Sequence, residues 1–341
     1  MYSFVNDYSE GAHPRILEAM QRNNLEQNRG YGMDLHSDAA KDHIKALIRK
    51  ENAEVHLIPG GTQTNLLVIS SFLRPHECVI AADTGHINVH ETGAIEATGH
   101  KVVTMPNKEG KLTPEAIERV LNNHSDEHMV KPKMVYLSNA TELGTIYTKQ
   151  ELTSIHQLCR EKQLYLFLDG ARIGTAMTCK ANDLTLPEIA DLVDIFYIGG
   201  TKNGALLGEA LIILREELKE EFRFMIKQKG ALLAKGFLIG IQFEELFRDE
   251  LYFNLAEHAN RMAERIASVL MECKFSFQAP PVTNQLFPTL PDTVIKELTK
   301  EFGFLIMERQ DEAHSIIRLV TSWATTEESV EKLCEFFRNI S

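Results

Sequence analysis

One lysine stands where lysine is uncommon, directly after an apolar run and among glycines. Residues 195–198 (Ile-Phe-Tyr-Ile) are aromatic or β-branched and predict a strand, and glycines flank Lys202 on both sides. A lysine desolvated by apolar neighbours loses its proton more easily, and the neutral amine can form a Schiff base with an aldehyde. From this stretch alone, a loop lysine that points into water is an equal alternative.

An acid at the end of a second apolar run favours the chemical interpretation. Residues 164–168 predict a strand, and Asp169 follows it. Pyridoxal phosphate needs a carboxylate beside its ring nitrogen, because a nearby negative charge keeps that nitrogen protonated and the ring able to accept electrons. Asp169 is the candidate for this partner.

The two motifs together carry a resemblance to a known family. Asp169-Gly-Ala-Arg172 and Thr201-Lys202-Asn203-Gly204 resemble the low-specificity L-threonine aldolases, in the β-eliminating lyase group of the fold-type I pyridoxal phosphate enzymes. The resemblance runs from residues 6–7 to residues 318–322 with the motifs in the family's order. It implies pyridoxal 5'-phosphate as cofactor and retro-aldol cleavage of β-hydroxy-α-amino acids, such as threonine and allo-threonine, to glycine and an aldehyde.

The order of the predicted elements indicates an α/β fold. Strands are expected at residues 100–105, 134–138 and 164–168, with helices at 114–122 and 149–161 between them, and this alternation predicts a mostly parallel sheet flanked by helices. We expect a large cofactor-binding domain over residues 1–245, including a short N-terminal arm, and a smaller C-terminal α+β domain over residues 246–341. Strands are predicted there at 285–289 and 315–322, and a helix at 292–301.

A glycine turn is the candidate phosphate site. The predicted strand 54–58 runs through Pro59 into Gly60, Gly61 and Thr62, and a helix is predicted over residues 63–73. The start of a helix offers free N–H groups and the positive end of its dipole. Taken alone, an ordinary strand-to-helix turn is the better interpretation, but the resemblance implies that these three residues and Thr201 contact the cofactor.

Two histidines four residues apart, His86 and His90, could share a helix face as metal ligands. The metalloprotease pattern requires Glu after the first histidine, and Ile87 stands there, so no metal site is expected. The resemblance implies that His86 lies over the cofactor ring and takes the substrate's β-hydroxyl proton. His90 is expected to be a helix-surface or packing residue.

Arginines are the candidates for holding the substrate carboxylate, because a guanidinium binds a carboxylate through two parallel hydrogen bonds. Arg172 and Arg318 match the family's carboxylate-binding positions, and a surface arginine on an edge strand is the alternative for Arg318. Asn6 stands where many family members have Ser, so it is a further candidate contact. Residues 138–144 could line the cofactor face.

A basic and aromatic segment over residues 223–230 could be a solvated helix face. The resemblance implies instead a homodimer or homotetramer with active sites at the subunit interface. Lys227, Lys229 and Lys235 would then be candidates for reaching a neighbouring cofactor phosphate.

Composition narrows the possible partners and compartment. The 341 residues carry a net charge of −12, which argues against nucleic acid or an anionic membrane as the main partner. No apolar run approaches the length of a bilayer span, and the first residues do not form a basic and apolar leader. The five cysteines are odd in number and scattered, which favours reduced thiols and a cytoplasmic protein.

Two other functions remain open at this stage. A β-eliminating lyase would use the same fold and cofactor but expel a leaving group at Cβ, giving ammonia and a keto acid. A non-catalytic amino-acid-binding protein on the same scaffold is less favoured, because Lys202, Asp169 and a carboxylate-binding arginine are all present.

Overall fold

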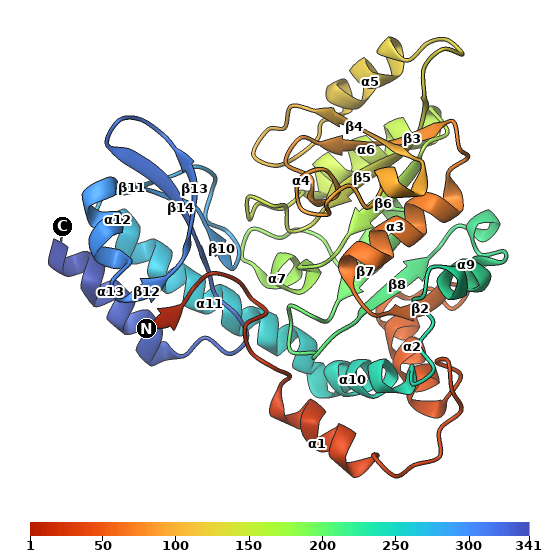
Figure 1. The fold of residues 1–341 in the computed structure, drawn as a ribbon, viewed down its shortest axis with the longest axis horizontal. Coiled ribbons are helices and arrows are strands. Elements are labelled where there is room, and N and C mark those ends of the chain that lie inside the picture. The colour runs from red at the N-terminus through yellow and green to blue at the C-terminus, as the bar shows by residue number, and fades with distance from the viewer. Residues whose placement is uncertain (341) are drawn as a thin grey trace.

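A computed structural model describes residues 1–340 (Figure 1). Its largest sheet has seven strands in the order β2-β8-β7-β6-β5-β3-β4. The strands are β2 (Glu54–Ile58), β3 (Glu77–Ala82), β4 (Lys101–Met105), β5 (Lys131–Ser138), β6 (Tyr165–Asp169), β7 (Ile195–Gly199) and β8 (Glu209–Ile213). Strand β8 is antiparallel to both of its neighbours, whereas the pairings among β7, β6, β5, β3 and β4 are parallel. The predicted mostly parallel sheet is therefore confirmed.

Helices cover both faces of this sheet, because successive residues of a strand point to opposite sides. In β6, Leu166 and Leu168 join one apolar core and Phe167 joins the other. The helices of this part are α1 (Pro14–Arg22), α2 (Leu35–Ile48), α3 (Gly61–Phe72), α4 (His86–Val89), α5 (Pro114–Asn123), α6 (Lys149–Glu161), α7 (Ile173–Thr178), α8 (Leu186–Leu192), α9 (Phe222–Gln228) and α10 (Phe237–Phe247), with short 3₁₀ turns η1 (Glu96–Thr98), η2 (Glu216–Leu218) and η3 (Arg248–Glu250). Helices α3 and α9 contribute to the core that contains Phe167.

Local sequence explains where two of these helices begin. Thr148 and Glu151 form a capping box at α6, and Thr185 and Glu188 form another at α8. In each box the threonine hydroxyl accepts from an N–H group of the first turn, and the glutamate accepts from the threonine N–H group.

A second, antiparallel sheet lies on the left of Figure 1, packed against the long helix α11 (Leu251–Glu272). Its strands are β9 (Ser276–Phe277), β10 (Gln285–Leu286), β11 (Pro288–Pro291), β13 (Leu305–Arg309) and β14 (His314–Val320), with helices α12 (Asp292–Leu298) and α13 (Glu327–Ile340) beside it. The predicted single strand over 285–289 is thus two short strands. Proline has no N–H group for a continuous ladder, and Pro288 begins the second strand.

The first residues of the chain lie with this second sheet and not with the large one. Strand β1 (Tyr2–Ser3) pairs in parallel with β12 (Phe302–Gly303), and Phe4 O accepts a 2.8 Å hydrogen bond from the Val320 N–H group. The N-terminal arm therefore crosses from the C-terminal part of the chain to α1.

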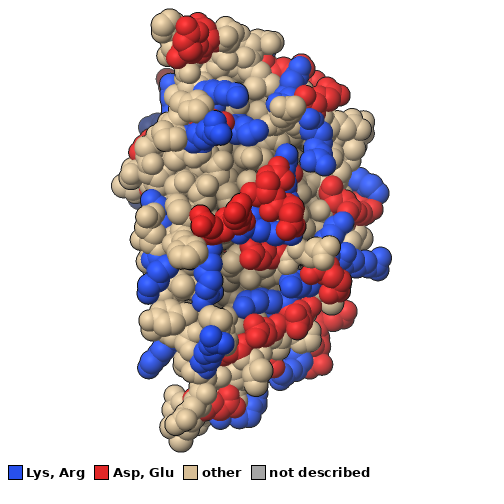
Figure 2. Space-filling view, turned by 90° about the vertical axis from the view of Figure 1, so that its right-hand side faces the viewer, with Lys and Arg blue, Asp and Glu red and all other residues tan. Residues whose placement is uncertain are grey.

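Charge on the face in Figure 2 is mixed in sign, with basic and acidic side chains lying side by side. Within residues 1–340, no helix has the length and apolar character needed to cross a membrane.

Candidate active site

A cavity of about 400 Å³ lies where β6 and β7 end. Ligands of open α/β sheets gather at the carboxyl ends of the strands. Every residue predicted to contact cofactor or substrate lines this cavity except Asn6 and Arg318; those that do are Gly60, Gly61, Thr62, His86, Asp169, Arg172, Thr201 and Lys202.

Two glycines allow the ends of β6 and β7 to approach closely. The Gly199 N–H group donates to Gly170 O at 3.0 Å. A Cβ atom on Gly170 would lie 1.8 Å from Tyr197 O, and one on Gly199 would lie 2.4 Å from Ala171 O. Neither position can carry a side chain unless the backbone moves. Glycine at both positions therefore allows the Asp169 and Lys202 segments to lie close together.

Lys202 lies in a turn between β7 and β8 that closes back on itself. The N–H groups of Gly200 and Thr201 both donate to Gly208 O, at 3.0 and 3.2 Å. Burial, together with the charge of Arg172, lowers the pKa of Lys202 below its ordinary value. Within residues 1–340, no carboxylate forms an ion pair with its amine, so the amine is free to react as a nucleophile.

Asp169 is buried and held by donors from three elements. Tyr136 donates to Oδ2 at 2.5 Å, Asn65 donates to the same oxygen at 3.2 Å, and Tyr197 donates to Oδ1. Burial acts to raise the pKa of Asp169, but the charge of His86 and the tyrosine hydrogen bonds outweigh it, and the pKa lies below its usual value. Asp169 is therefore a fixed carboxylate that stays ionised.

Helix α3 begins at the cavity without a side-chain cap. Gly60 stands at the N-cap position and makes no side-chain capping bond, so the first N–H groups of α3 have no such partner. Thr201 lines the same cavity, but its hydroxyl is bonded inside the Lys202 turn. The hydroxyl donates to Glu209 Oε1 at 2.9 Å and accepts from the Gly208 N–H group at 3.0 Å.

This donor set fits pyridoxal phosphate. A nucleophilic amine, an ionised carboxylate and uncapped helix N–H groups lie around one cavity, matching the aldehyde, ring nitrogen and phosphate of the cofactor. Lys202, Asp169 and the residues at the start of α3 would hold these three parts.

His86 is oriented by a buried carboxylate. Its Nδ1 lies 2.8 Å from Glu91 Oε1, and the Glu91 side chain is fully buried. A carboxylate at Nδ1 favours the tautomer with the proton on that nitrogen, which leaves Nε2 able to accept a proton. Asn65 donates to the same Glu91 oxygen at 2.7 Å, so this one amide joins the His86 pair to Asp169.

His90 is exposed, as expected of a surface residue, but it also lines the cavity. Its ring centre is 5.5 Å from that of His86. Helix α4 has a single turn and His90 follows its last residue, so the two histidines do not share one face of a longer helix. Partial desolvation and the charge of His86 lower the pKa of His90.

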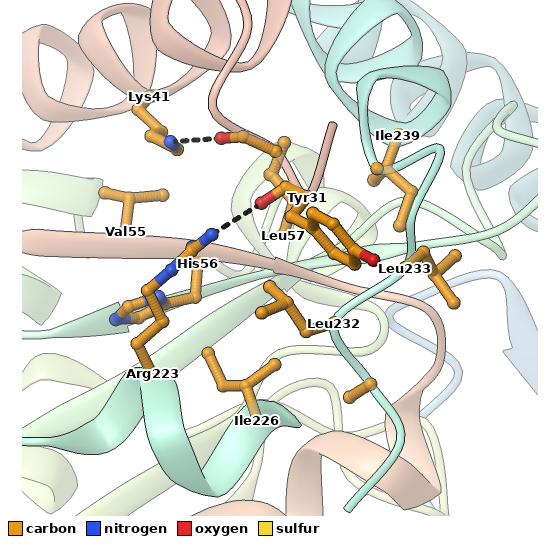
Figure 3. Close-up of a pocket in the computed structure, with 13 residues that line it drawn as sticks. Tyr31, Lys41, Val55, His56, Leu57, Arg223, Ile226, Leu232, Leu233 and Ile239 are labelled. Carbon is orange, nitrogen blue, oxygen red and sulfur yellow. Dashed lines mark hydrogen bonds between the residues drawn. The ribbon is translucent and has the colours of Figure 1, made fainter. Parts of the chain in front are cut away.

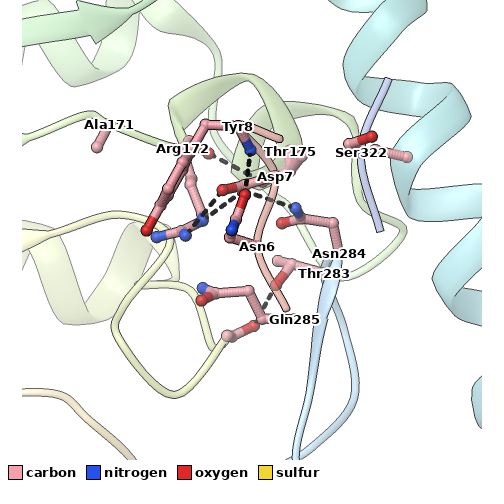
Figure 4. A network of polar contacts seen from close by, with 12 residues as sticks. Asn6, Asp7, Tyr8, Ala171, Arg172, Thr175, Thr283, Asn284, Gln285 and Ser322 are labelled. Carbon is pink, nitrogen blue, oxygen red and sulfur yellow. Dashed lines mark hydrogen bonds and ion pairs between the residues drawn. The ribbon is translucent and has the colours of Figure 1, made fainter. Parts of the chain in front are cut away.

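The two predicted carboxylate-binding arginines have different partners. Arg172 already forms a two-bond ion pair with the buried Asp7, at 2.7 Å from Nε and 3.0 Å from Nη2 (Figure 4). Arg318 donates from Nη2 to Val5 O at 3.1 Å, and its buried Nε has no partner among residues 1–340. The unpaired group thus belongs to Arg318, which lies outside the cavity lining.

Asn6 does not reach the cavity and instead organises its own loop. Its Oδ1 accepts from the Tyr8 N–H group at 2.9 Å and from the Ser9 hydroxyl at 3.0 Å. The next residue, Asp7, is the one that contacts Arg172, and Asn284 donates to Asp7 Oδ2 at 3.0 Å.

Several residues of the site were not identified from the sequence. They are Asp7, Asn65, Glu91, Tyr136, Tyr197 and Glu209. Tyr136 could have been found, since it lies on the predicted strand 134–138 next to the Asp169 strand. Asn65 and Glu91 carry no such signal, because their roles depend on contacts between separate helices and loops.

The basic segment that follows β8 makes mostly structural contacts. Around a second, small cavity of about 30 Å³, Arg223 donates to Tyr31 O at 2.9 Å and Lys41 donates to Gly32 O at 3.0 Å (Figure 3). Lys227 lies 4.7 Å from the centre of the Tyr31 ring, and Lys235 is exposed. None of Lys227, Lys229 and Lys235 lines the large cavity.

Comparison with known proteins agrees with this arrangement. The chain is 52% identical to the threonine aldolase of Leishmania major in a solved structure, covering 100% of this chain and 99% of that one with a TM-score of 0.98. It is 31% identical to a low-specificity L-threonine aldolase of Pseudomonas sp. strain NCIMB 10558, over 99% of this chain and 97% of that protein. The Escherichia coli K12 protein of the same name is 26% identical over 90% of each chain. The predicted resemblance is confirmed.

The fold also matches more distant structures. An aromatic aminotransferase from Pyrococcus horikoshii is 16% identical, with a TM-score of 0.73 over 99% of this chain and 98% of that one. This likeness shows the fold alone, and it confirms the predicted fold-type I architecture. Residues 6–292 match the family model described as beta-eliminating lyase, and this span contains both motif segments and every residue that lines the large cavity. The chain therefore belongs to the beta-eliminating lyase family.

Proposed function

We propose that this protein is a pyridoxal phosphate-dependent carbon–carbon lyase that cleaves β-hydroxy-α-amino acids of the threonine type to glycine and an aldehyde. The observation that carries the proposal is the assembly of Lys202, Asp169 and His86 around one cavity, in a chain similar over its whole length to threonine aldolases.

The cofactor, when bound, accepts the electron pair of the bond that breaks at the substrate's Cα atom. Lys202 would hold the cofactor through its amine, and Asp169 would keep the ring nitrogen protonated. Gly60, Gly61 and Thr62, beside Thr201, would hold the phosphate at the start of α3.

His86 moves the proton that aldol cleavage requires. As the aldehyde leaves, the β-hydroxyl group must lose its proton, and Nε2 of His86 takes it, directly or through water. Glu91 supports this step at the opposite nitrogen, because its buried charge stabilises the protonated ring.

The substrate carboxylate lies between the two arginines and fixes which bond at Cα aligns for cleavage. Arg318 offers its unpaired Nε, and Arg172 offers the edge that Asp7 leaves open. Asn6 is a further candidate contact after a small movement of the N-terminal arm.

The protein is further proposed to act as a cytoplasmic homodimer or homotetramer with active sites at the subunit interface. Large apolar side chains are exposed on the single chain, including Leu206 (44%) and Leu207 (40%) next to Lys202 and Phe224 (74%) on α9, and a partner subunit would cover them. All five cysteines are free, which suits a reducing compartment.

The decisive experiment offers threonine, allo-threonine, phenylserine and serine separately and identifies the products. Substrates with a carbon substituent at Cβ should give glycine and an aldehyde. Several substituents should be accepted, because the assigned residues contact the carboxylate, the ring and the β-hydroxyl group. Keto acid and ammonia as the main products would favour a β-eliminating lyase, and tight binding of one compound without turnover would favour an amino-acid-binding protein.

A further inference from the structure

Glu209 is a buried acid in the cavity wall to which the proposed reaction assigns no role. Its residue is only 4% exposed, and within residues 1–340 its carboxylate forms no ion pair. It begins β8, where its backbone lies opposite Ile58 on β2 and Gly199 on β7. Glu209 therefore stands between the strand that leads into the turn before α3 and the strand that leads to Lys202.

The Glu209 side chain is hydrogen-bonded to the Lys202 turn. Oε1 accepts from the Thr201 hydroxyl at 2.9 Å, and Oε2 accepts from the Gly200 N–H group at 3.1 Å. Glu209 lines the same cavity as Gly60, Gly61 and Thr62. A phosphate dianion bound at the start of α3 would thus share this cavity with Glu209.

A negative charge at Glu209 would be disfavoured twice. A buried carboxylate without an ion-pair partner loses its hydration, and a neighbouring dianion would repel it. The groups that face it are Lys202 in the turn, Asp169 on β6, Tyr197 on β7 and Tyr252 on α11. Burial raises the pKa of Glu209 to about 8, against the opposing effects of the Thr201 hydrogen bond and the Lys202 charge.

We propose that Glu209 is a neutral carboxylic acid in the cofactor-bound protein, and that its proton is required for tight binding of the cofactor phosphate. This inference rests on the proposed function. Since binding favours the protonated acid, affinity for the phosphorylated cofactor should fall as pH rises through the titration of Glu209 in the free protein.

The test compares pyridoxal phosphate with pyridoxal, which lacks the phosphate, on cofactor-free protein between pH 6.5 and 9.5. Both compounds react with Lys202, so the ratio of their dissociation constants cancels the titration of that lysine. In the unmodified protein the advantage of the phosphorylated compound should shrink above about pH 8, approaching about tenfold per pH unit. In Glu209→Gln, which cannot ionise, the ratio should not change with pH.

Glu142→Gln is the matched control. Glu142 lines the same cavity, and burial raises its pKa as well, but it bonds to Ser138 and to the His86 N–H group. This variant should keep the pH dependence of the ratio. Equal slopes in the unmodified protein and Glu209→Gln, or loss of the slope in Glu142→Gln alone, would overturn the assignment.

A measurement on the unmodified protein covers the case in which Glu209→Gln does not fold. Calorimetry at pH 8.5 in two buffers of different ionisation enthalpy measures the protons taken up on binding. Binding of pyridoxal phosphate should take up as much as about one more proton per site than binding of pyridoxal. Equal proton uptake would refute the inference. If instead neither compound forms a borohydride-reducible link to Lys202, the proposed function itself fails.

Discussion

The side chains proposed to carry the chemistry are each held by a buried partner. Asp169 has two tyrosines, His86 has Glu91, and Arg172 has Asp7. Such supporting bonds fix the direction in which a reactive group points, so that little reorganisation is needed during reaction. Replacing a supporting residue should therefore change the rate or pH profile without abolishing cofactor binding.

His86 and Glu91 allow the proton-transfer role to be separated from stacking on the ring. His86→Phe keeps an aromatic ring but cannot take a proton, so it should bind cofactor and lose about 10²- to 10⁴-fold in kcat. Glu91→Gln can still accept a bond from Nδ1 but carries no charge to stabilise the protonated ring, and should lower kcat while leaving cofactor binding intact. Cofactor absorbance and steady-state kinetics measure both effects. A fully active His86→Phe would remove His86 from the mechanism.

Arg318 is the clearest site for a carboxylate contact, because its buried Nε has no partner. Arg318→Lys loses the planar two-bond geometry and should raise KM for amino acids by about 10- to 100-fold. The ultraviolet–visible spectrum of the bound cofactor should be unchanged, since Arg318 lies outside the cavity lining. An unchanged KM would make Arg318 a structural residue of β14.

At the scale of elements, the N-terminal arm connects parts of the chain that are far apart in sequence. It pairs with β12, accepts a bond from β14, and then brings Asp7 to Arg172 at the end of β6. Asn284, just before β10, donates to the same Asp7 oxygen. The position of Arg172 is therefore coupled to the arm and to the second sheet.

Asp7→Ala should be strongly destabilising, since it leaves the guanidinium of Arg172 buried and unpaired. The expected loss is about 3–5 kcal/mol in the free energy of unfolding, measured by urea denaturation of the cofactor-free protein. Asn6→Ala, on the same arm, breaks only local bonds and should cost much less. Similar losses in the two variants would contradict the assigned role of Asp7.

The contribution of Asp7 should depend on pH. Burial acts to raise the pKa of Asp7, but the charge of Arg172 and the bonds from Arg172 and Asn284 lower it below its ordinary value. A carboxylate whose pKa is lower in the folded than in the unfolded protein stabilises the fold at any pH above the unfolded-state pKa, which is about 4. This stability is lost as the pH falls through the folded-state pKa. The stability gap between the unmodified protein and Asp7→Ala should thus be full near pH 7 and narrow below about pH 4.

At the scale of the whole molecule, exposed apolar side chains are the basis of the proposed assembly. Leu25 and Leu35 are 92% and 84% exposed, and Phe224 is 74% exposed. Light scattering after size exclusion should give two or four times the chain mass of 38.6 kDa. Phe224→Glu should lower this mass if α9 lies in the interface, whereas Met271→Glu, on the distant α11, should not. A monomer for the unmodified protein would refute the proposed assembly.

The sequence alone predicted the chemistry at Lys202 and Asp169, because each follows an apolar strand and their two motifs together carry the family resemblance. It also determined the alternation of strands and helices and hence the fold class. The division into domains at residue 245 stays a prediction, since the arm formed by the first residues lies with the second sheet.

Only the tertiary structure decided which polar groups meet. Asn65 lies 104 positions from Asp169, and Asn284 lies 277 positions from Asp7, so no local pattern could pair them. The same holds for the ion pair between Arg172 and Asp7, because the sequence suggests only a substrate carboxylate as the partner of Arg172. Burial decided the rest: it selects which carboxylates stay charged beside a cation or several donors, as Asp7 and Asp169 do, and which keep a proton, as Glu209 is inferred to do.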